Sequence, residues 1–528
     1  MENNFYLTTA IAYTNGSPHF GHAYEIICAD ILARYHKLFD KNVFFTTGTD
    51  EHGTKISETA KSLNMLPIEL CDKYVMEFQK LYKMLNINID KFIRTTDENH
   101  KDVAKLCLAK AMENSDIYFG EYIGWYCVRE ERFFTETEAK TCNYVDPVSK
   151  KPLTKSSEPS YFFKLSNYQD RIIEHILHNP NFILPSSSRE EILNRLTTDK
   201  LEDLSISRTK SVMDWGIEID EDNVMYVWFD ALINYLSVID YPNGENFMFW
   251  PANIHLIGKD ICWFHAVIWP AMLMSFNLAL PKTILAHGFV NDINGHKMSK
   301  SIGNVIDPVK LLEKYNPDVI RMYLAYATNI GSDLNISITD IDIVHDSLLA
   351  AKFSNLANRC LVLTTKLNSN MIPESDGTEL FSIDTLKTEI HENLELFKTK
   401  DIISILFTHL DIVNKYLTDL QPWLQKGSYL NVLRTVLEGI YIIGIFLSPF
   451  IPETINKLCE FMNSDMCSDI NNLTWNNLKT GNNLNEYEML FKKMKTRHEI
   501  TEEEKEIEKQ KVELRRLEKK NRKNNNKK

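Results

Sequence analysis

Two histidines three positions apart carry the first chemical signal in this sequence. In TNGSPHFGHAYE, residues 14–25, His19 and His22 follow an apolar stretch and enclose Gly21. The proline before them keeps the backbone extended, and Gly21 allows a tight turn where a helix begins. A strand, a turn of small residues and a helix N-terminus form an anion site in doubly wound sheets, and two imidazoles would add donors to a phosphate chain. A metal site would need further ligands, which this stretch lacks, and two surface histidines at a turn remain the plain alternative.

A second stretch, NDINGHKMSKSIGN at residues 291–304, gathers amines and hydroxyls on one loop. Its Asn294-Gly295 step predicts a hairpin turn, which Lys297, Ser299 and Lys300 follow. Two lysines and two hydroxyls on a loop bounded by glycines suit the β- and γ-phosphates of a leaving pyrophosphate. Alone, such a loop is usually solvated surface, but together with the histidine stretch it predicts a nucleotide site.

The elements that must position these residues alternate between strand and helix. Short apolar, β-prone runs predict strands at residues 5–13, 42–48, 253–258 and 283–290. Between the first two, apolar residues at helical spacing predict a helix. The residues with this spacing are Ala23, Ile26, Ile27, Ile31, Leu32 and Tyr35. Alternating strands and helices predict an α/β fold with a doubly wound parallel sheet.

The same pattern divides the chain into parts. The alternation lapses in one internal segment, and after the last predicted strands the chain turns helical with little strand signal. The predicted parts are a sheet domain at 1–345 with halves at 1–114 and 226–345, an inserted module at 115–225, a helix bundle at 346–490 and a charged helical tail at 491–528 that becomes disordered.

Composition narrows the class of protein. The 528 residues are 44% hydrophobic and 25% charged, as in ordinary soluble globular proteins. No stretch approaches the roughly 20 apolar residues that span a bilayer, and the N-terminus lacks the pattern of a signal or transit peptide. Nine scattered cysteines without a C-x-x-C pair favour free thiols in a reducing compartment. We expect a cytoplasmic protein with no membrane contact, and the mitochondrial matrix stays open.

Charge is unevenly distributed along the chain. The formal net charge of −13 argues against a protein that coats nucleic acid. Residues 509–528 nevertheless carry ten Lys or Arg against two Glu. This basic end is either a solvated terminus, which we favour, or a loose tether for RNA.

The two motifs together resemble the class I aminoacyl-tRNA synthetases, whose signatures are H-x-G-H and K-M-S-K-S. The rest of the chain, from about residue 5 to 490, resembles the methionyl-tRNA synthetase family of that class. The local markers are TTAIAYTNGSPHFGH, TTGTDEHGTKI, EPSYFFKLS, DLSISR, VWFDALINY, IGKDICWFHAVIWPAML, FSNLANR and LQPWLQKG. The family more often has Ile or Leu where this chain has Phe20, and proline where it has Ala12 and Leu232.

The resemblance implies a Rossmann-like catalytic sheet that activates L-methionine with ATP and Mg²⁺ and transfers it to tRNA(Met). His19, His22, Lys297 and Lys300 are the expected stabilisers of transition-state charge, since such chemistry consists mostly of positioning and electrostatics. The expected ATP-binding residues are Asn15, Gly21, Gly258, Lys259, Asp260, Lys297, Ser299 and Lys300.

The methionine site is expected at the ends of the same strands. Asp50 ends a predicted strand, where its carboxylate would pair with the α-ammonium as the family aspartate does, although a helix N-cap is the alternative. The remaining expected pocket residues are Ala10, Ile11, Tyr13, Trp228, Ala231, Leu232, Tyr235, Phe264, His265 and Ile268. Plain core packing is the alternative for any one of the aromatics, above all Phe264.

The inserted module is expected to be free of metal. Zinc-bearing relatives have paired C-x-x-C knuckles here, whereas in this chain Cys127 is followed three positions later by Glu130 and Cys142 by Val145. A tetrahedral zinc site on lone cysteines is implausible.

In the helical part, Asn355 and Arg359 lie four apart on one helix face, and Trp423 follows in QPWLQ. The resemblance implies that these three read the anticodon, with the aromatic ring stacked on a base. An Asn/Arg pair that joins two helices is the alternative.

The remaining expectations concern partners and rival functions. We expect initiator and elongator tRNA(Met) as substrates and a monomer, since the family's dimerising C-terminal extension is not seen. The alternative functions are those of another class I synthetase, a catalytically inactive RNA-binding paralogue or a small-molecule adenylyltransferase.

Overall fold

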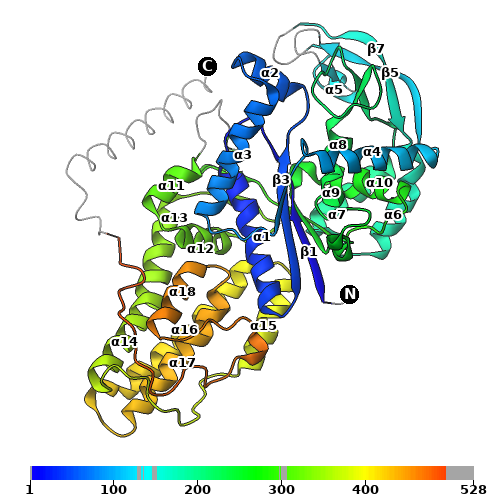
Figure 1. Cartoon of the computed structure of the whole chain (residues 1–528). Coiled ribbons are helices and arrows are strands. Elements are labelled where there is room, and N and C mark those ends of the chain that lie inside the picture. The colour runs from blue at the N-terminus through cyan, green and yellow to red at the C-terminus, as the bar shows by residue number, and fades with distance from the viewer. Residues whose placement is uncertain are drawn as a thin grey trace, which may run out of the picture.

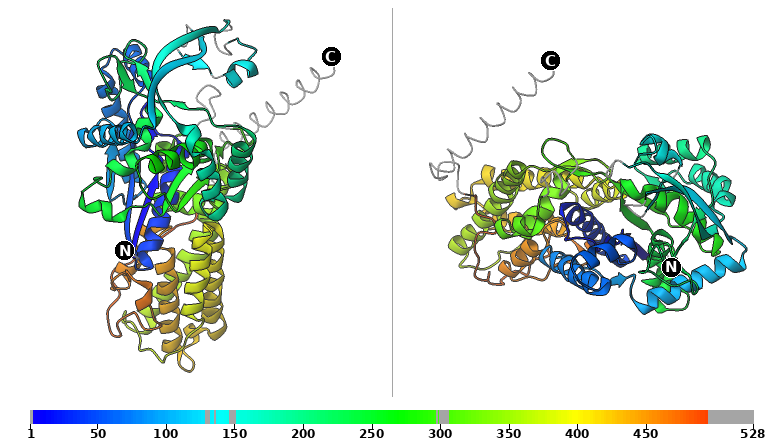
Figure 2. Two further views of the ribbon diagram at one scale, coloured as in Figure 1. Left: turned by 90° about the vertical axis from the view of Figure 1, so that its right-hand side faces the viewer. Right: turned by 90° about the horizontal axis from the view of Figure 1, so that it is seen from above.

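The computed structural model describes residues 3–127, 132–134, 136–145, 151–296, 298 and 306–494. Figures 1 and 2 show an elongated molecule with a helix bundle at one end and, at the other, the sheet that contains β5 and β7. The central sheet lies between them, with its first helix α1 (Phe20–Leu38) beside it.

The strands of the central sheet pair in parallel throughout the described part of the chain, as predicted. Its strand order is β2-β3-β1-β12-β13-β8, and β4 pairs with β3. The strands are β1 (Asn4–Thr9), β2 (Ala12–Tyr13), β3 (Asn42–Asp50), β4 (Lys91–Arg94), β8 (Ile183–Leu184), β12 (Ile254–Gly258) and β13 (Thr283–His287). The doubly wound α/β fold is therefore confirmed.

Two of the predicted strands are shorter than their apolar runs. The run 5–13 is divided into β1 and β2, and the run 283–290 ends at His287. Gly288 follows directly, and it lets the chain pass close to the Ser332 backbone, from which an added Cβ would be only 2.3 Å away. The chain leaves the sheet there, and β14 (Val290–Asn291) pairs with β15 (Leu334–Asn335) instead.

Helices cover both sides of this sheet. The predicted spacing in α1 is confirmed, because Ala23, Ile26, Ile27, Ile31, Leu32 and Tyr35 are all buried. The other helices of this part are α2 (Thr54–Ser62), α3 (Pro67–Met84), α4 (Glu98–Glu113), α8 (Val227–Leu232), α9 (Asn234–Ser237), α10 (Trp269–Ser275), α11 (Pro308–Lys314), α12 (Pro317–Ala327) and α13 (Ile338–Ile343).

The stretch predicted as an insertion contains an antiparallel sheet of its own. Its strands, in the order β6-β5-β7-β9, are β5 (Ile117–Cys127), β6 (Arg132–Phe134), β7 (Thr154–Phe163) and β9 (Leu204–Ser205). The same stretch holds α5 (Glu136–Thr141), α6 (Gln169–His178), α7 (Ser186–Thr198) and the hairpin β10 (Ser207–Thr209) with β11 (Asn223–Met225).

One part of this stretch belongs to the central sheet rather than to an independent module. Strand β8 lies inside 115–225, yet Ile183 and Leu184 pair in parallel with β13. A two-residue strand has no periodicity that a sequence could reveal. The insertion is therefore discontinuous in space, because its middle returns to the central sheet.

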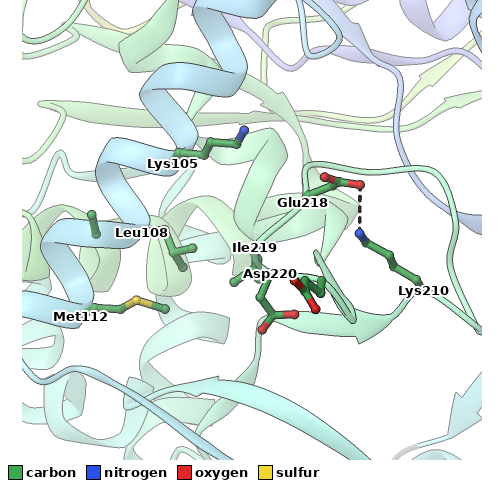
Figure 3. Close-up of a pocket in the computed structure, with 9 residues that line it drawn as sticks. Lys105, Leu108, Met112, Lys210, Glu218, Ile219 and Asp220 are labelled. Atoms are coloured by element: carbon green, nitrogen blue, oxygen red, sulfur yellow. Dashed lines mark hydrogen bonds and ion pairs between the residues drawn. The ribbon is translucent and has the colours of Figure 1, made fainter.

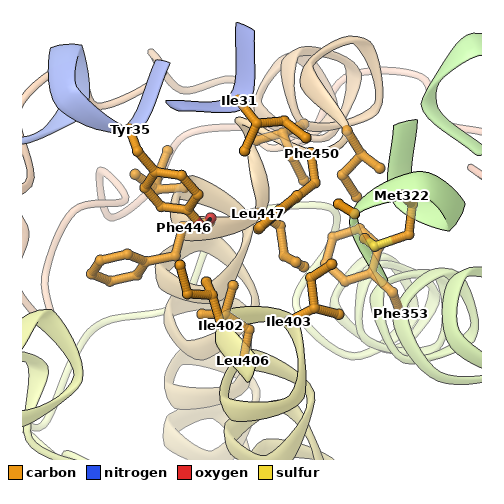
Figure 4. Close-up of a cluster of buried hydrophobic side chains, with 14 of the residues drawn as sticks. Ile31, Tyr35, Met322, Phe353, Ile402, Ile403, Leu406, Phe446, Leu447 and Phe450 are labelled. Atoms are coloured by element: carbon orange, nitrogen blue, oxygen red, sulfur yellow. Dashed lines mark hydrogen bonds between the residues drawn. The ribbon is translucent and has the colours of Figure 1, made fainter. Parts of the chain in front are cut away.

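The helix bundle consists of α14 (Asn355–Leu367), α15 (Ile383–Glu395), α16 (Thr399–Leu420), α17 (Tyr429–Leu447) and α18 (Pro452–Phe461). Figure 4 shows Ile31 and Tyr35 of α1 against Phe446, Leu447 and Phe450 in one buried cluster. The Tyr35 hydroxyl also donates to the Phe446 carbonyl at 2.6 Å. The bundle and the sheet domain thus share a continuous apolar core.

Helix α17 is the only described helix that is long and apolar enough to cross a bilayer, contrary to the expectation that no stretch comes near that length. Of its most apolar window, 89% is buried inside the protein. A core helix has this property because it is surrounded by other helices, so α17 is no evidence for a membrane.

Candidate active site

The two histidines lie at the N-terminus of α1, at the carboxyl edge of the sheet. His19 is the N-cap, and its Nδ1 accepts from the Gly21 N–H at 3.1 Å. The Nδ1 of His22 accepts from the backbone N–H of His19 at 3.1 Å, and the two rings stack with centroids 3.7 Å apart. Because each Nδ1 is an acceptor, the proton of each neutral ring is on Nε2.

Gly21 is required by this arrangement rather than by a positive φ. An added Cβ would lie 3.0 Å from Cε1 and 3.1 Å from Nδ1 of His19. The missing side chain leaves room for the imidazole to fold back over the helix N-terminus. The helix N-terminus and the two stacked imidazoles lie together, which suits a phosphate group.

The lysines of the second motif, Lys297 and Lys300, and also Ser299, lie outside the described residues. The predicted turn before them is confirmed: Gly295 has φ +79°, and the Asp292 carboxylate accepts from the N–H groups of Asn294 and His296 at 2.9 and 3.0 Å. Strand β14, which leads into this turn, lies against α1. The start of the loop is therefore close to the histidine helix.

Asp50 ends β3 beside the histidine loop. The N–H of Thr14 donates to its carbonyl at 3.1 Å, which fixes the start of that loop to the end of β3. The carboxylate Oδ1 of Asp50 is buried and has no hydrogen-bond partner within the described part of the chain. Burial and the charge of Asp230 raise the pKa of this carboxyl well above its usual value. A buried acceptor without a donor is where a ligand ammonium would be bound most strongly.

Aromatic side chains line the region next to α8. The rings of Trp228 and Phe264 stack in parallel with centroids 3.6 Å apart. Tyr235 lies at 2.7 Å from His265 Nε2, and His265 Nδ1 lies at 3.0 Å from the Ile261 carbonyl. Nδ1 therefore carries the ring proton and donates it, while Nε2 accepts the Tyr235 hydroxyl. Burial lowers the pKa of His265 to about 4, so the pocket histidine is neutral at physiological pH.

Most other expected pocket residues lie in the same buried cluster. Leu232 and Ile268 belong to it, and Ala10 packs against it. Ala231, the residue before Leu232, is also buried. Phe264 opens a π-helical turn, Phe264–Ile268, a backbone feature common at functional sites. Two residues pack elsewhere. Ile11 contacts a cluster with Tyr6 and Val238, and Tyr13 contacts a cluster around Ile56 on α2.

The expected nucleotide residues follow β12. An added Cβ at Gly258 would lie 2.7 Å from the Asp260 carboxylate, so the glycine allows that carboxylate to fold over the strand end. Lys259 pairs with Asp333 at 2.6 Å, which fixes its amine. Asn15 is exposed on the loop before α1.

Two residues that were not among the expected site residues lie beside Asp260. His287 Nε2 is 3.0 Å from the Glu25 carboxylate, and both side chains are largely buried. Burial raises the pKa of Glu25. Burial alone would lower the pKa of His287, but the neighbouring Glu25 carboxylate outweighs this effect and raises the pKa of His287. Glu25 follows His22 by three residues on one helix face, and His287 ends a strand, so position alone could have indicated both.

A separate cavity of about 620 Å³ lies between α4 and the β10–β11 hairpin. Figure 3 shows Lys105, Leu108 and Met112 facing Ile219 and Asp220, with Lys210 paired to Glu218. None of the residues expected from the motifs lines it. Its walls mix both signs of charge with apolar groups and indicate no particular ligand.

A known family model, described as tRNA synthetases class I (M), matches residues 5–150 and 143–361. The chain belongs to this family.

Relatives and solved structures agree with that assignment. The methionine–tRNA ligase of Clostridium tetani is 37% identical over 95% of this chain and 80% of its own length, and that of Mycobacterium leprae is 38% identical over 87% and 89%. The Mycobacterium tuberculosis methionyl-tRNA synthetase in complex with methionyl-adenylate has a TM-score of 0.83 at 36% identity, covering 93% of this chain and 99% of that one. Its apo form has a TM-score of 0.79 at 33% identity, covering 93% and 98%.

The three residues expected to read an anticodon lie together in the bundle. Asn355 and Arg359 are on α14, and Trp423 is in the 3-10 turn Pro422–Leu424 after α16. The Arg359 guanidinium is 6.0 Å from the centre of the Trp423 ring and 3.3 Å from the Asn414 amide oxygen. Trp423 is 39% exposed, although large aromatic rings are usually buried. An exposed ring beside a guanidinium suits base stacking.

Proposed function

We propose that this chain is a methionine–tRNA ligase that activates L-methionine with ATP and transfers the methionyl group to the 3′ end of tRNA(Met). Family membership and the methionine–tRNA ligase relatives support the reaction class. The observation within the chain that carries the proposal is the buried Oδ1 of Asp50, which has no hydrogen-bond partner in the described part of the chain and lies at the strand end next to the histidine loop.

In the first step, the methionine carboxylate attacks the α-phosphate of ATP and pyrophosphate leaves. His19 and His22 donate from Nε2 to phosphate oxygens as negative charge builds up. Lys297 and Lys300 neutralise the leaving pyrophosphate, and Ser299 adds a hydroxyl donor. Fixed donors of this kind accelerate reaction because they need no reorganisation in the transition state.

The amino acid is held at both ends. Asp50 accepts the ammonium, and Trp228, Tyr235 and His265 enclose the thioether. Since the neutral His265 has both ring nitrogens engaged, it selects for shape rather than for charge. Discrimination against a ligand shorter by one methylene is limited to about 1–3 kcal/mol, so homocysteine is also activated.

The nucleotide lies between the histidine helix and the β12 end, where Asn15, Gly21, Gly258, Lys259 and Asp260 contact it. Mg²⁺ accompanies ATP on its phosphates, as is usual for this ion. In the described residues, no group of three or more His, Cys, Asp or Glu side chains could hold a metal. We propose that the insertion contains no zinc, which metal analysis of the purified protein checks, because stoichiometric zinc would contradict it.

In the second step the 3′-terminal hydroxyl of tRNA(Met) takes the methionyl group. Trp423 stacks on an anticodon base while Asn355 and Arg359 bind base edges, for both initiator and elongator tRNA. We propose a cytoplasmic monomer that contacts no membrane. Sedimentation and fractionation of cells test these two points.

The decisive experiment is ATP–pyrophosphate exchange with a panel of the twenty amino acids, followed by charging of purified tRNA. Methionine alone should support exchange, and only tRNA(Met) should then be charged. Exchange with cysteine or leucine instead would identify another class I synthetase. No exchange with any amino acid would indicate an inactive paralogue.

A further inference from the structure

Side chains from distant segments form hydrogen bonds that fix the turn containing Asp50. Glu51 points inward, where Arg94 donates to its two oxygens at 2.8 and 2.9 Å. Trp215 donates from its indole to the Glu51 carbonyl at 2.5 Å and accepts from the Gly53 N–H at 3.0 Å. Asp50 is thus the one acid in this turn whose carboxylate keeps an oxygen without a partner among the described residues.

His52 connects this turn to a buried carboxylate on another element. Its Nδ1 lies 2.6 Å from Asp230 Oδ2, and the second oxygen of Asp230 lies 2.6 Å from Nε2 of His100 on α4. Ser237 holds the other nitrogen of His100 at 2.8 Å. All of these side chains are buried. Burial opposes the charge on Asp230, but the two imidazoles outweigh it and lower its pKa to about 2.

The same histidine is only two residues from Asp50 in the chain. The contact of its ring with Asp230 therefore holds the short segment that carries Asp50 against α8. Asp230 lies on α8, two residues after Trp228 and one before Ala231, so a single short chain of contacts joins the two ends of the expected methionine site.

We propose that Asp230, acting through His52 and His100, is a positioning residue for the α-ammonium of methionine. It keeps the Asp50 turn at a fixed distance from α8, so that the unpaired oxygen of Asp50 faces the bound ammonium. Asp230 does not touch the substrate. This inference rests on the proposed function, because it assigns a role within the methionine site.

The test compares two replacements of His52 in the full-length chain. His52→Asn places an amide donor near the position of Nδ1, so it can keep the bond to Asp230, whereas His52→Leu cannot. In ATP–pyrophosphate exchange, His52→Leu and Asp230→Asn should raise the KM for methionine at least about tenfold, and His52→Asn should raise it less than about threefold. The KM for ATP should change less than about twofold in all three, and inhibition by L-methioninol, which keeps the ammonium, should weaken in step with the methionine KM.

Glu438→Gln is the matched control, because it also replaces a buried, fully paired carboxylate by an amide, but within the helix bundle. It should lower the melting temperature without changing the KM for methionine. A general loss of folded protein lowers kcat by reducing active enzyme and leaves KM unchanged, so it cannot imitate the expected result.

Three results would overturn the inference. These are an unchanged methionine KM in Asp230→Asn and His52→Leu, an equal rise in the KM for ATP, or equal losses in His52→Asn and His52→Leu. If the wild-type protein shows no exchange with methionine, the proposed function itself fails, which is a different outcome.

Discussion

Two carboxylates in different parts of the molecule, Glu438 and Asp50, have opposite hydrogen-bond environments. In the bundle, Glu438 accepts three hydrogen bonds, from the Leu478 N–H at 2.9 Å and from the backbone and side-chain nitrogens of Asn477 at 3.1 and 3.0 Å, and it forms an ion pair with Arg434 at 2.9 Å. In the sheet domain, Asp50 keeps one oxygen without a partner among the described residues, although that atom is closed to solvent.

The difference separates a structural role from a binding role. A saturated carboxylate such as Glu438 joins segments of the fold and has no capacity left for a ligand. A buried oxygen without a donor destabilises the free protein and is stabilised once a ligand supplies a proton donor. The anticodon residues follow the same logic, since Trp423 stays exposed while the neighbouring bundle core is closed.

The largest effect is expected for Asp50→Asn on methionine activation. Losing an ionic partner for the ammonium leaves that charge uncompensated in a buried site, which costs on the order of 3–5 kcal/mol. The kcat/KM for methionine in ATP–pyrophosphate exchange should fall about a thousandfold, with little change in the KM for ATP. A loss below tenfold would place the ammonium elsewhere.

The histidine pair should give the next largest effect. His19→Asn and His22→Asn each keep an acceptor near the Nδ1 position for capping α1 but remove the Nε2 donor. We expect kcat for exchange to fall about a hundredfold or more in each, with the methionine KM nearly constant. If the fall in kcat is fully explained by a loss of thermal stability, the rings act only as caps of the helix terminus.

A change in the bundle should affect tRNA charging rather than methionine activation. Trp423→Ala should lower kcat/KM for tRNA charging by about 10- to 100-fold, since a stacked base contributes about 1–3 kcal/mol. ATP–pyrophosphate exchange should stay within about twofold, because the ring is remote from the sheet edge. Equal losses in both assays would count against anticodon contact.

The smallest expected effect is that of Asp50→Asn on the stability of the free protein. Since the folded state raises the pKa of Asp50 above its ordinary 3.8, its ionisation destabilises the fold as the pH rises. Asp50→Asn should therefore increase the free energy of unfolding by about 1–2 kcal/mol at neutral pH. This gain should disappear below about pH 4, where the wild-type carboxyl is protonated in both states.

The matched change in the bundle has the opposite sign, and urea unfolding at several pH values measures both. Glu438→Gln should destabilise by about 3–5 kcal/mol, because it breaks a paired carboxylate. If both variants lose stability alike, the two carboxylates are equivalent and the distinction drawn between them is wrong.

Much of this site could be predicted because its residues fall in local patterns. His19, Gly21 and His22 occupy one strand–turn–helix unit, and Asp50 ends a strand, so their place at the sheet edge follows from chain order. Family resemblance was needed for the pocket aromatics, since Trp228 and Phe264 look like ordinary core in the sequence.

What could not be predicted depends on contacts between distant positions. The bridge from His52 through Asp230 to His100 joins residues 178 and 130 positions apart, and no spacing rule predicts such a pairing. Strand β8 could not be predicted for a related reason, because two apolar residues form a strand only when β13 lies beside them.

The most direct test of the central claim is a crystal structure of this chain with a non-hydrolysable methionyl-adenylate analogue. The analogue's ammonium nitrogen should lie about 2.7–2.9 Å from Oδ1 of Asp50, the charge-assisted hydrogen-bond distance. If the ammonium contacts other groups and that oxygen still has no partner, Asp50 is not the ammonium site.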